Sequence, residues 1–172
     1  VNAFCNYGTK IGSLLGIENL GKITAIQNAT DSNTGCFRNQ KSLTYAKLPN
    51  TLKSIGSYAF YGCSTLASVN FPSSITTIGS FAFALALDDV DCSFDNLTSL
   101  GSVAFYKSGL RSFSAPLLET IPATSNNLSV FYNCTKLKTI NIPNVKSIPY
   151  KTFENCAIEG QLNLNATSIG FA

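Results

Sequence analysis

Apolar and polar positions along this chain repeat with a fixed spacing of 23 residues, most clearly within residues 43–83. The first copy holds Leu43, Ala46, Leu48, Pro49, Leu52, Ile55, Gly56, Ala59 and Phe60. Exactly one period later, the second copy holds Leu66, Val69, Phe71, Pro72, Ile75, Ile78, Gly79, Ala82 and Phe83. Self-similarity at a fixed period in this range predicts a stacked array, in which each repeat packs only on its neighbours.

A phenylalanine, which we call the marker, stands at the same position of each repeat. The markers are Phe4, Phe37, Phe60, Phe83, Phe105, Phe131 and Phe153, at intervals of 33, 23, 23, 22, 26 and 22 residues. In two repeats the gap between the marker and the preceding isoleucine is longer, and these insertions fall within Thr24–Gly35 and Pro122–Val130. Both insertions occur at the same phase of the repeat, and insertions in repeat arrays map to loops on one face. The sequence therefore predicts two polar loops on the same side of the array.

Each repeat also contains a short stretch in which apolar and polar residues alternate, as in Leu66–Phe71. Alternation with period two indicates a half-buried strand. Pro72 follows directly, and proline tends to end a ladder because it lacks an N–H donor. The Ile78-Gly79 pair then predicts a corner, with glycine supplying backbone freedom, and Ser80–Phe83 predicts a short helical turn or an irregular link.

The repeat resembles that of BspA-like leucine-rich repeat surface proteins, which reads roughly L-x-x-L-x-L-P-x-x-L-x-x-I-G-x-x-A-F-x-x-C. Residues Leu43–Cys63 match this pattern almost position for position, and the resemblance covers essentially the whole chain. It implies an α/β-type repeat solenoid that is rich in β structure. We expect a right-handed leucine-rich-repeat superhelix, or horseshoe, with one parallel strand per coil of about 23 residues.

The domain organisation follows from the same repeat. We expect residues 1–172 to form a single leucine-rich-repeat domain of about seven repeats. Solenoids need polar capping repeats to cover their end faces, and neither end of this sequence shows one. We therefore expect the chain to be a segment of a longer array.

Composition favours an extracellular scaffold. Charged residues make up 12% of the chain, about half of the usual share, and Ser, Thr and Asn are abundant. A net charge of +3 is too small and too scattered to indicate a nucleic acid or an anionic membrane as partner. The longest apolar run, Phe81–Leu87, is far shorter than the ~20 residues that a membrane-spanning helix needs. We expect neither nucleic-acid binding nor membrane insertion.

The six cysteines are expected to pack as buried thiols, because most of them occupy fixed positions of the repeat and a free cysteine behaves as a small hydrophobe. The cysteines at repeat positions are Cys36, Cys63, Cys92, Cys134 and Cys156, whereas Cys5 lies outside the pattern. Their spacings match no zinc-binding pair. One bridge stays open as an alternative, between Cys134 and Cys156 in adjacent repeats, where stacked coils approach the ~5.5 Å Cα separation of a disulfide.

The sequence contains few candidate catalytic residues. The chain has no histidine and only nine carboxylates, which removes the commonest general base and metal ligand. No glycine-rich phosphate loop is present. An acidic group at Asp88, Asp89, Asp91 and Asp95 suggests a weak cation or basic-partner site, but it lacks the order of a calcium loop, and a solvated acidic patch explains it as well. We expect no enzyme activity, no cofactor and no metal site.

Candidate binding residues therefore come from the surface of the array. Along the strands the outward positions are small and polar, and the extended face of a solenoid commonly binds partners. These strand candidates are Tyr45, Lys47, Ser68, Asn70, Asp91, Ser112, Ser114, Thr139 and Asn141. The insertions add the loop candidates Asn28, Asp31, Asn33, Asn126 and Asn127. A solvated sheet face without a partner remains the alternative.

The resemblance implies a function as well as a fold. BspA-like repeat proteins are typically secreted or located at the cell surface, and they are implicated in adhesion to host matrix proteins such as fibronectin and fibrinogen. The sequence is thus interpreted as a non-catalytic extracellular module for protein interaction and adhesion. The alternative is a structural spacer, or an accessory module that displays another domain, catalytic or not, of the parent protein.

Overall fold

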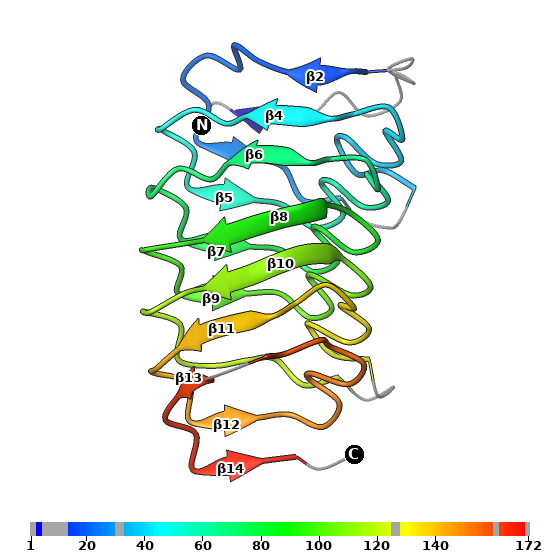
Figure 1. Cartoon of the computed structure of the whole chain (residues 1–172). Helices are drawn as coiled ribbons and strands as arrows, with labels where there is room; N and C mark the ends of the chain where they lie inside the picture. Colours follow the sequence, from blue (N-terminus) through cyan, green and yellow to red (C-terminus); the bar gives the residue numbers. More distant parts are fainter. Residues whose placement is uncertain (1–2, 5–13, 30–32, 125–127, 160–161, 171–172) are drawn as a thin grey trace.

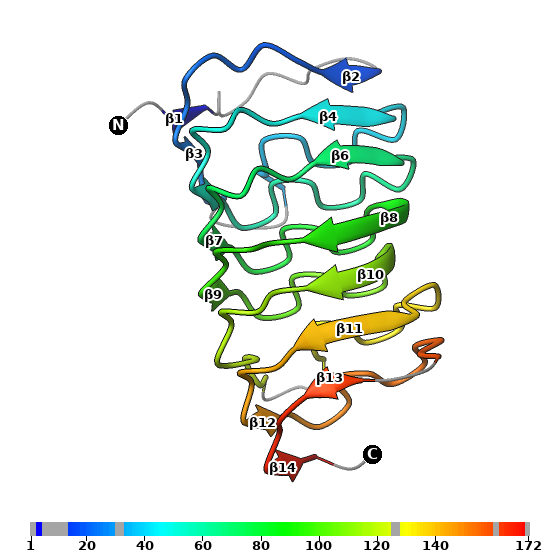
Figure 2. The same ribbon diagram turned by 60° about the vertical axis from the view of Figure 1, so that its left-hand side comes forward.

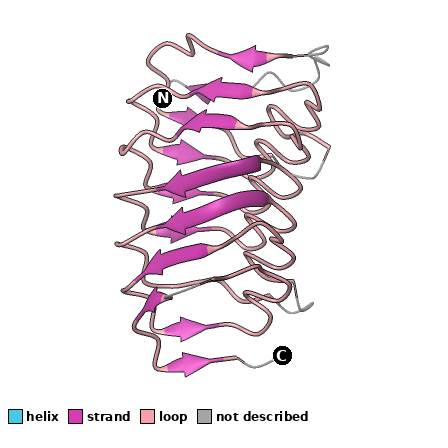
Figure 3. Cartoon of the chain, viewed as in Figure 1, coloured by secondary structure: helices cyan, strands magenta, loops and turns pink. Residues whose placement is uncertain are grey.

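The computed structural model describes residues 3–4, 14–29, 33–124, 128–159 and 162–170. In this part of the chain the backbone winds into a column of stacked coils made of parallel strands and turns, without a helix (Figures 1 and 3). The expected β-rich solenoid is confirmed, since paired residues of successive strands, such as Tyr45 and Ser68, lie 23 positions apart. The α/β class is not confirmed because no described residue is helical. A right-handed horseshoe stays a prediction.

One side of the column, which we call the strand side, carries two parallel ladders (Figure 2). The first ladder contains β2 (Gly16–Ile17), β4 (Tyr45–Lys47) and β6 (Ser68–Asn70). The second contains β8 (Asp88–Ser93), β10 (Gly109–Ser114), β11 (Thr139–Ile142) and β13 (Asn163–Leu164). Between the ladders β6 and β8 lie side by side, and the Asp88 N–H donates to the Leu66 carbonyl at 2.9 Å. The alternation seen in the sequence places these strands correctly.

A second sheet lies behind the strand side and corrects the expectation of one strand per coil. Its five-stranded part contains β1 (Ala3–Phe4), β3 (Ala25–Ile26), β5 (Ser54–Ile55), β7 (Thr77–Ile78) and β9 (Ser99–Leu100). Its two-stranded part pairs β12 (Ser147–Ile148) with β14 (Ser168–Ile169). A glycine follows β5, β7, β9 and β14 and is needed for close approach, since a Cβ on Gly79 would lie 2.4 Å from the Ser57 nitrogen.

The third side, which we call the turn side, connects the second sheet to the next strand-side strand. Its backbone adopts positive φ two residues before the marker phenylalanine and again two residues after it, for example at Tyr58 (57°) and Gly62 (73°). Every second N–H there donates to the next coil: Tyr58 to Ser80, Phe60 to Ala82 and Gly62 to Ala84, at 2.8–3.0 Å. Of the two forms expected for this segment, a helical turn or an irregular link, the structure has no helical turn but consecutive turns that carry their own hydrogen-bond ladder.

The core is filled by the marker phenylalanines, which stack on one another through the column. Centroid distances between successive rings are 5.1, 5.1, 5.4, 5.9 and 5.7 Å from Phe37 to Phe153. Further aliphatic residues from all three sides pack around this stack. No helix of the described residues has the length and hydrophobicity needed to cross a membrane.

The described cysteines follow the expected pattern except at Cys36. Cys63, Cys92, Cys134 and Cys156 are free thiols, as expected, so the alternative of a bridge between Cys134 and Cys156 is wrong. The Cys134 thiol lies 2.9 Å from the Phe105 carbonyl and the Cys156 thiol 3.1 Å from the Phe131 carbonyl, so each donates to the backbone of the preceding coil. Cys36, expected as a packing thiol, is instead half-buried and disulfide-bonded. Cys5 lies outside the described residues.

Candidate functional site

The strand side brings most of the candidate binding residues into one surface. Six of them are exposed and three are half-buried: Tyr45, Lys47, Ser68, Asn70, Asp91 and Thr139, then Ser112, Ser114 and Asn141. Tyr45 pairs with Ser68 and Lys47 with Asn70 in the first ladder. In the second ladder Ser112 stands between Asp91 and Thr139. The register therefore places these residues in adjacent rows across the coils.

Several of the asparagines and serines on this side are engaged within the protein. The Asn70 side chain accepts a hydrogen bond from the Leu48 N–H at 2.7 Å and donates to the Leu48 carbonyl at 3.0 Å. Asn141 donates to the Ser114 hydroxyl at 2.9 Å and accepts from Asn163 at 2.5 Å. These side chains tie neighbouring coils together, which makes them structural residues first. Ser68, Thr139 and Lys47, in contrast, make no side-chain hydrogen bond to any described residue.

Tyr45 is held in place by the coil before it. Its ring covers Gly16, where an added Cβ would lie 2.1 Å from the ring. A hydrogen bond to the Glu18 carboxylate raises the pKa of the Tyr45 phenol. Although its side chain is 39% exposed, Tyr45 thus presents a fixed aromatic surface, which loses little conformational entropy when a partner binds.

The acidic group on β8 is neutralised by cations of later coils. The Arg111 guanidinium forms a bidentate pair with Asp91 and lies 3.5 Å from Asp89, and Lys136 lies 2.5 Å from Asp88. Hydrogen bonds from Arg111 and Ser112 lower the pKa of the Asp91 carboxyl. Asp95 follows β8 and does not join this network. Among the described residues no group of three or more acidic or cysteine side chains is arranged to hold a metal ion.

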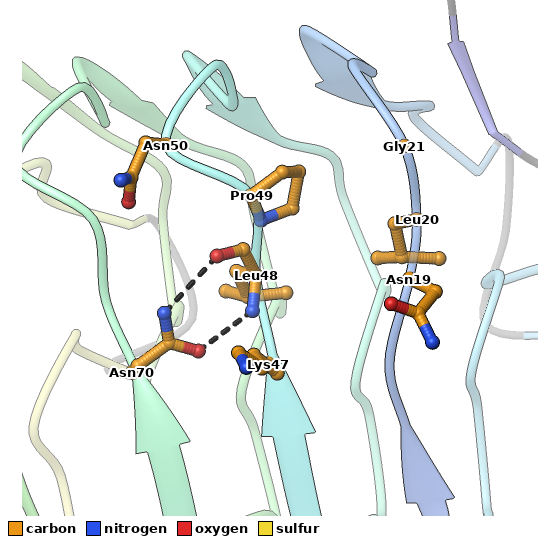
Figure 4. Close-up of a pocket in the computed structure, with 8 residues that line it drawn as sticks. All are labelled: Asn19, Leu20, Gly21, Lys47, Leu48, Pro49, Asn50 and Asn70. Carbon is orange, nitrogen blue, oxygen red and sulfur yellow. Dashed lines mark hydrogen bonds between the residues drawn. The ribbon is translucent and has the colours of Figure 1, made fainter.

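A hollow of about 360 Å³ opens just beyond the C-terminal ends of β2 and β4, between the coils that contain these strands (Figure 4). It is lined by Asn19, Leu20, Gly21, Lys47, Leu48, Pro49, Asn50 and Asn70. At the next corner along the column, the Asn70 amide closes the gap by bonding to both backbone groups of Leu48. Lys47 occupies the corresponding position here, and an ammonium group can only donate. The corner therefore stays open, with one cation at its edge.

Sequence reasoning missed Asn19 and Asn50 because neither belongs to the alternating strand positions. Asn19 follows β2 and adopts a left-handed backbone, with φ of 55°. Lys47 and Asn70 stand at the same position of neighbouring repeats. The lysine in place of the asparagine is the sequence signal that could have indicated the hollow.

The loop candidates are only partly described. Asn28 and Asn33 are both exposed. Asn28 follows β3, and its side-chain oxygen accepts a hydrogen bond from the Ser57 N–H at 2.8 Å. Asp31, Asn126 and Asn127 lie outside the described residues. The grouping of the loop candidates into one binding site stays a prediction.

The cysteine thiols have the environment of core residues. Burial raises the pKa of Cys63 to about 12 and that of Cys156 to about 11. Burial also raises the pKa of Cys92 and of Cys134 well above the ordinary value. A nucleophilic cysteine requires the opposite shift, since the thiolate is the reactive form. These four thiols are therefore suited to packing and to hydrogen bonding with the backbone.

Comparison with known proteins identifies the repeat. The family described as "BspA type Leucine rich repeat region (6 copies)" matches residues 30–159. No curated protein matches the chain at a significant level.

Three solved structures share the fold. A leucine-rich repeat protein from Bacteroides ovatus is 26% identical with a TM-score of 0.53, over 77% of this chain and 38% of that one. One from Eubacterium ventriosum is 20% identical with a TM-score of 0.60, over 90% and 38%. The leucine-rich repeat protein of T. pallidum is 23% identical with a TM-score of 0.62, over 97% and 83%. The chain thus spans less than half the length of the first two.

Proposed function

The chain belongs to the BspA-type leucine-rich repeat family, and from this premise we propose that it is a non-catalytic extracellular module that binds a protein partner through its strand side. Leucine-rich repeats of this kind serve as protein-interaction modules. The observation that carries the proposal is the row of outward polar residues, which the parallel ladders hold in register across successive coils.

The strand side contains some side chains that are held by internal hydrogen bonds and others that can contact a partner. The asparagine ties hold neighbouring coils in place, so that the surface is preorganised before a partner arrives. Ser68, Thr139 and Lys47 remain available for contacts with a partner. Preorganisation lowers the entropic cost of association, which suits a surface without deep pockets to a broad protein interface.

Two observations support an extracellular location. Cys36 is disulfide-bonded, and disulfides persist mainly in oxidising compartments such as the cell exterior. The low share of charged residues, 12%, agrees with this location. As the partner we propose a host matrix protein such as fibronectin or fibrinogen, bound in adhesion by a secreted or surface-located parent protein.

Surface plasmon resonance against immobilised fibronectin and fibrinogen tests the proposal. Ser68→Arg combined with Thr139→Arg places two bulky cations on the strand side, and binding of this variant should fall by about tenfold or more. The control is Ser99→Arg, an exposed serine of β9 in the second sheet, which should bind as the parent chain does. Equal binding by all three proteins would exclude the strand side.

The insertions provide the second arm of this experiment. Residues 28–33 and 125–128 are replaced by short Gly-Ser links while the strand side is left intact. Loss of binding only in these trimmed chains would move the site to the loops.

The second candidate function is a spacer or accessory module that displays another domain of the parent protein. The length of the relatives favours it, since this chain covers 38% of the proteins from Bacteroides ovatus and Eubacterium ventriosum. Absence of binding to both matrix proteins would support the spacer over the adhesion module.

A further inference from the structure

The turn side carries a group of aromatic and cationic side chains that the strand-side function does not use. It consists of Tyr106, Lys107, Tyr132, Tyr150 and Lys151, which we call the tyrosine–lysine group. The Lys107 ammonium lies 5.2 Å from the Tyr106 ring centroid, and that ring stacks on Tyr132 at 5.7 Å. Lys151 lies 5.8 Å from the Tyr132 centroid and 5.4 Å from that of Tyr150. One continuous series of contacts therefore crosses neighbouring coils.

These contacts fix the cations at the surface. The rings of Tyr106 and Tyr132 are nearly parallel, with an interplanar angle of 12°, so each turns one face to the other ring, and both residues are half-buried. Lys107 is exposed, Tyr150 is 44% exposed and Lys151 is half-buried. Glu154 pairs with Lys151 at 3.0 Å, which leaves two ammonium groups against one carboxylate. A cation held against an aromatic face keeps its hydrogen-bond donors available to an anion.

A second group of the same kind lies on the turn side toward the N-terminus. Arg38 lies 5.8 Å from the Tyr61 centroid, Tyr61 lies 5.8 Å from Tyr58, and Tyr58 stacks on Phe81 at 4.9 Å. Tyr61 and Tyr106 each follow a marker phenylalanine and stand two coils apart. At ~4.8 Å per coil, about 10 Å separates them along the column. The two groups thus lie along one row on the turn side, which the intervening coil interrupts with the buried Ala84.

The backbone beneath this row is strained. Tyr58, Phe81, Lys107 and Lys151 all adopt positive φ between 51° and 58°. Glycine or asparagine would occupy such positions at lower cost. The same positive φ recurs at Leu85 and Val103, so it belongs to the turn geometry of the column.

We propose that the turn side binds an acidic polysaccharide, whose carboxylate or sulfate groups contact Lys107 and Lys151 and whose sugar rings contact the exposed Tyr150. Tyrosine suits this ligand because it combines an apolar ring with a hydroxyl donor. A polymer that carries many acidic groups can contact cations on more than one coil. This site is separate from the strand side. If the polysaccharide proposal is wrong, the proposed protein interaction is therefore unaffected.

The test compares binding of two acidic polymers, heparin and polygalacturonate, with that of neutral dextran, by isothermal titration calorimetry. Lys107→Asn combined with Lys151→Asn removes both cations, and asparagine tolerates positive φ, as it does at Asn133 and Asn155 in this chain. The matched control is Lys53→Asn with Lys146→Asn, which removes the same charge just before β5 and β12 of the second sheet. Circular dichroism and melting temperature verify that both variants fold.

Binding to at least one acidic polymer should weaken about tenfold or more in the first variant and less than about twofold in the control. Affinity should fall as salt is added. It should rise for chains long enough to reach both groups, compared with a disaccharide. Equal affinity of the two variants, binding of dextran as tight as that of the acidic polymers, or no binding at all would overturn the proposal. Equally tight binding of poly-glutamate would also overturn it and would indicate an acidic protein instead.

Discussion

At the scale of single residues, the marker phenylalanines determine how the coils stack. Phe60 and Phe83 have no exposed surface, and each ring contacts the equivalent ring of the coils on both sides. A side chain in this position fills space between two repeats, so its removal affects two interfaces at once. The exposed Tyr45 ring, in contrast, covers Gly16 of the preceding coil at the surface.

Replacement of Phe83 by alanine should therefore be far more destabilising than Tyr45→Ala. Truncation of a buried phenylalanine costs about 3–5 kcal/mol, which is a large part of the ~5–15 kcal/mol that stabilises a typical domain. Urea unfolding followed by circular dichroism measures both variants. Equal losses for the two variants would show that the assignment of the repeat positions is wrong.

The buried thiols predict a loss of stability in alkali. Burial raises the pKa of Cys63 to about 12, whereas an exposed thiol of the unfolded chain has a pKa of ~8.5. Because the folded-state pKa is the higher one, the contribution of Cys63 is complete below pH ~8.5 and is lost as pH rises from there toward the folded value. Up to about 2 kcal/mol should disappear between pH ~8.5 and ~10.

Cys63→Ser provides the comparison, because a serine hydroxyl does not titrate in this range. The free energy of unfolding, measured at pH 7, 9 and 10, should fall less steeply in the variant than in the parent chain. Parallel pH curves for the two proteins would contradict the assignment of Cys63 as a buried thiol.

At the scale of elements, the sequence predicted the strand side well and the other two sides less well. Alternation in stretches such as Leu66–Phe71 is long enough to identify a half-buried strand. The strands of the second sheet, such as Thr77–Ile78, have two residues each, too few for a period to appear. The turn side was missed because its left-handed positions hold residues such as Tyr58, Leu85 and Val103, where local preference would indicate glycine or asparagine.

The candidate site was predictable only as a row of outward positions. The strand period indicates that Asn70 and Asn141 point outward, as they do. It does not indicate that both bind neighbouring coils, because those partners lie on repeats 22 to 27 residues away. The hollow at Lys47 was missed for the same reason. The hollow stays open because Lys47 does not make the hydrogen bonds to the neighbouring backbone that Asn70 makes to Leu48 in the next coil.

Relief of strain on the turn side should raise stability. Leu85 is 38% exposed and has φ of 55°, a conformation that asparagine adopts more readily. Leu85→Asn should therefore increase the free energy of unfolding by about 0.5–1 kcal/mol. Leu117→Asn is the matched control, since Leu117 is 46% exposed and does not have positive φ. A gain in both variants, or in neither, would argue against backbone strain at Leu85.

At the scale of the whole molecule, each coil packs on the coils before and after it, so that stability is largely a sum of local terms. The Lys136–Asp88 ion pair reaches one coil further. Charge is distributed unevenly along this column. Residues 54–87 contain no charged side chain, and the acidic group on β8 follows directly. The uncharged coils separate the hollow beside Lys47 from the ion pairs of Arg111 and Lys136.

Hydrogen exchange should reveal this linear arrangement. Amide protons of β8 and β10 have neighbouring coils on both sides and should exchange at least about tenfold more slowly than those of β14. Among the described strands, β14 pairs with β12 alone, and its Ile169 is 52% exposed. Mass spectrometry of peptides from exchanged protein measures the gradient. Uniform protection along the column would indicate a single cooperative unit instead.

The hydrogen-bond ladder of the turn side has a direction. Its N–H groups donate from each coil to the following one, from Phe37 onto Ala59 through to Asn133 onto Glu154. At the corner that follows β7 the direction is reversed, because the Gly79 N–H donates back to the Ile55 carbonyl. On the turn side each coil thus offers acceptors to the coil before it and donors to the coil after it, so that the coils stack there in a single orientation.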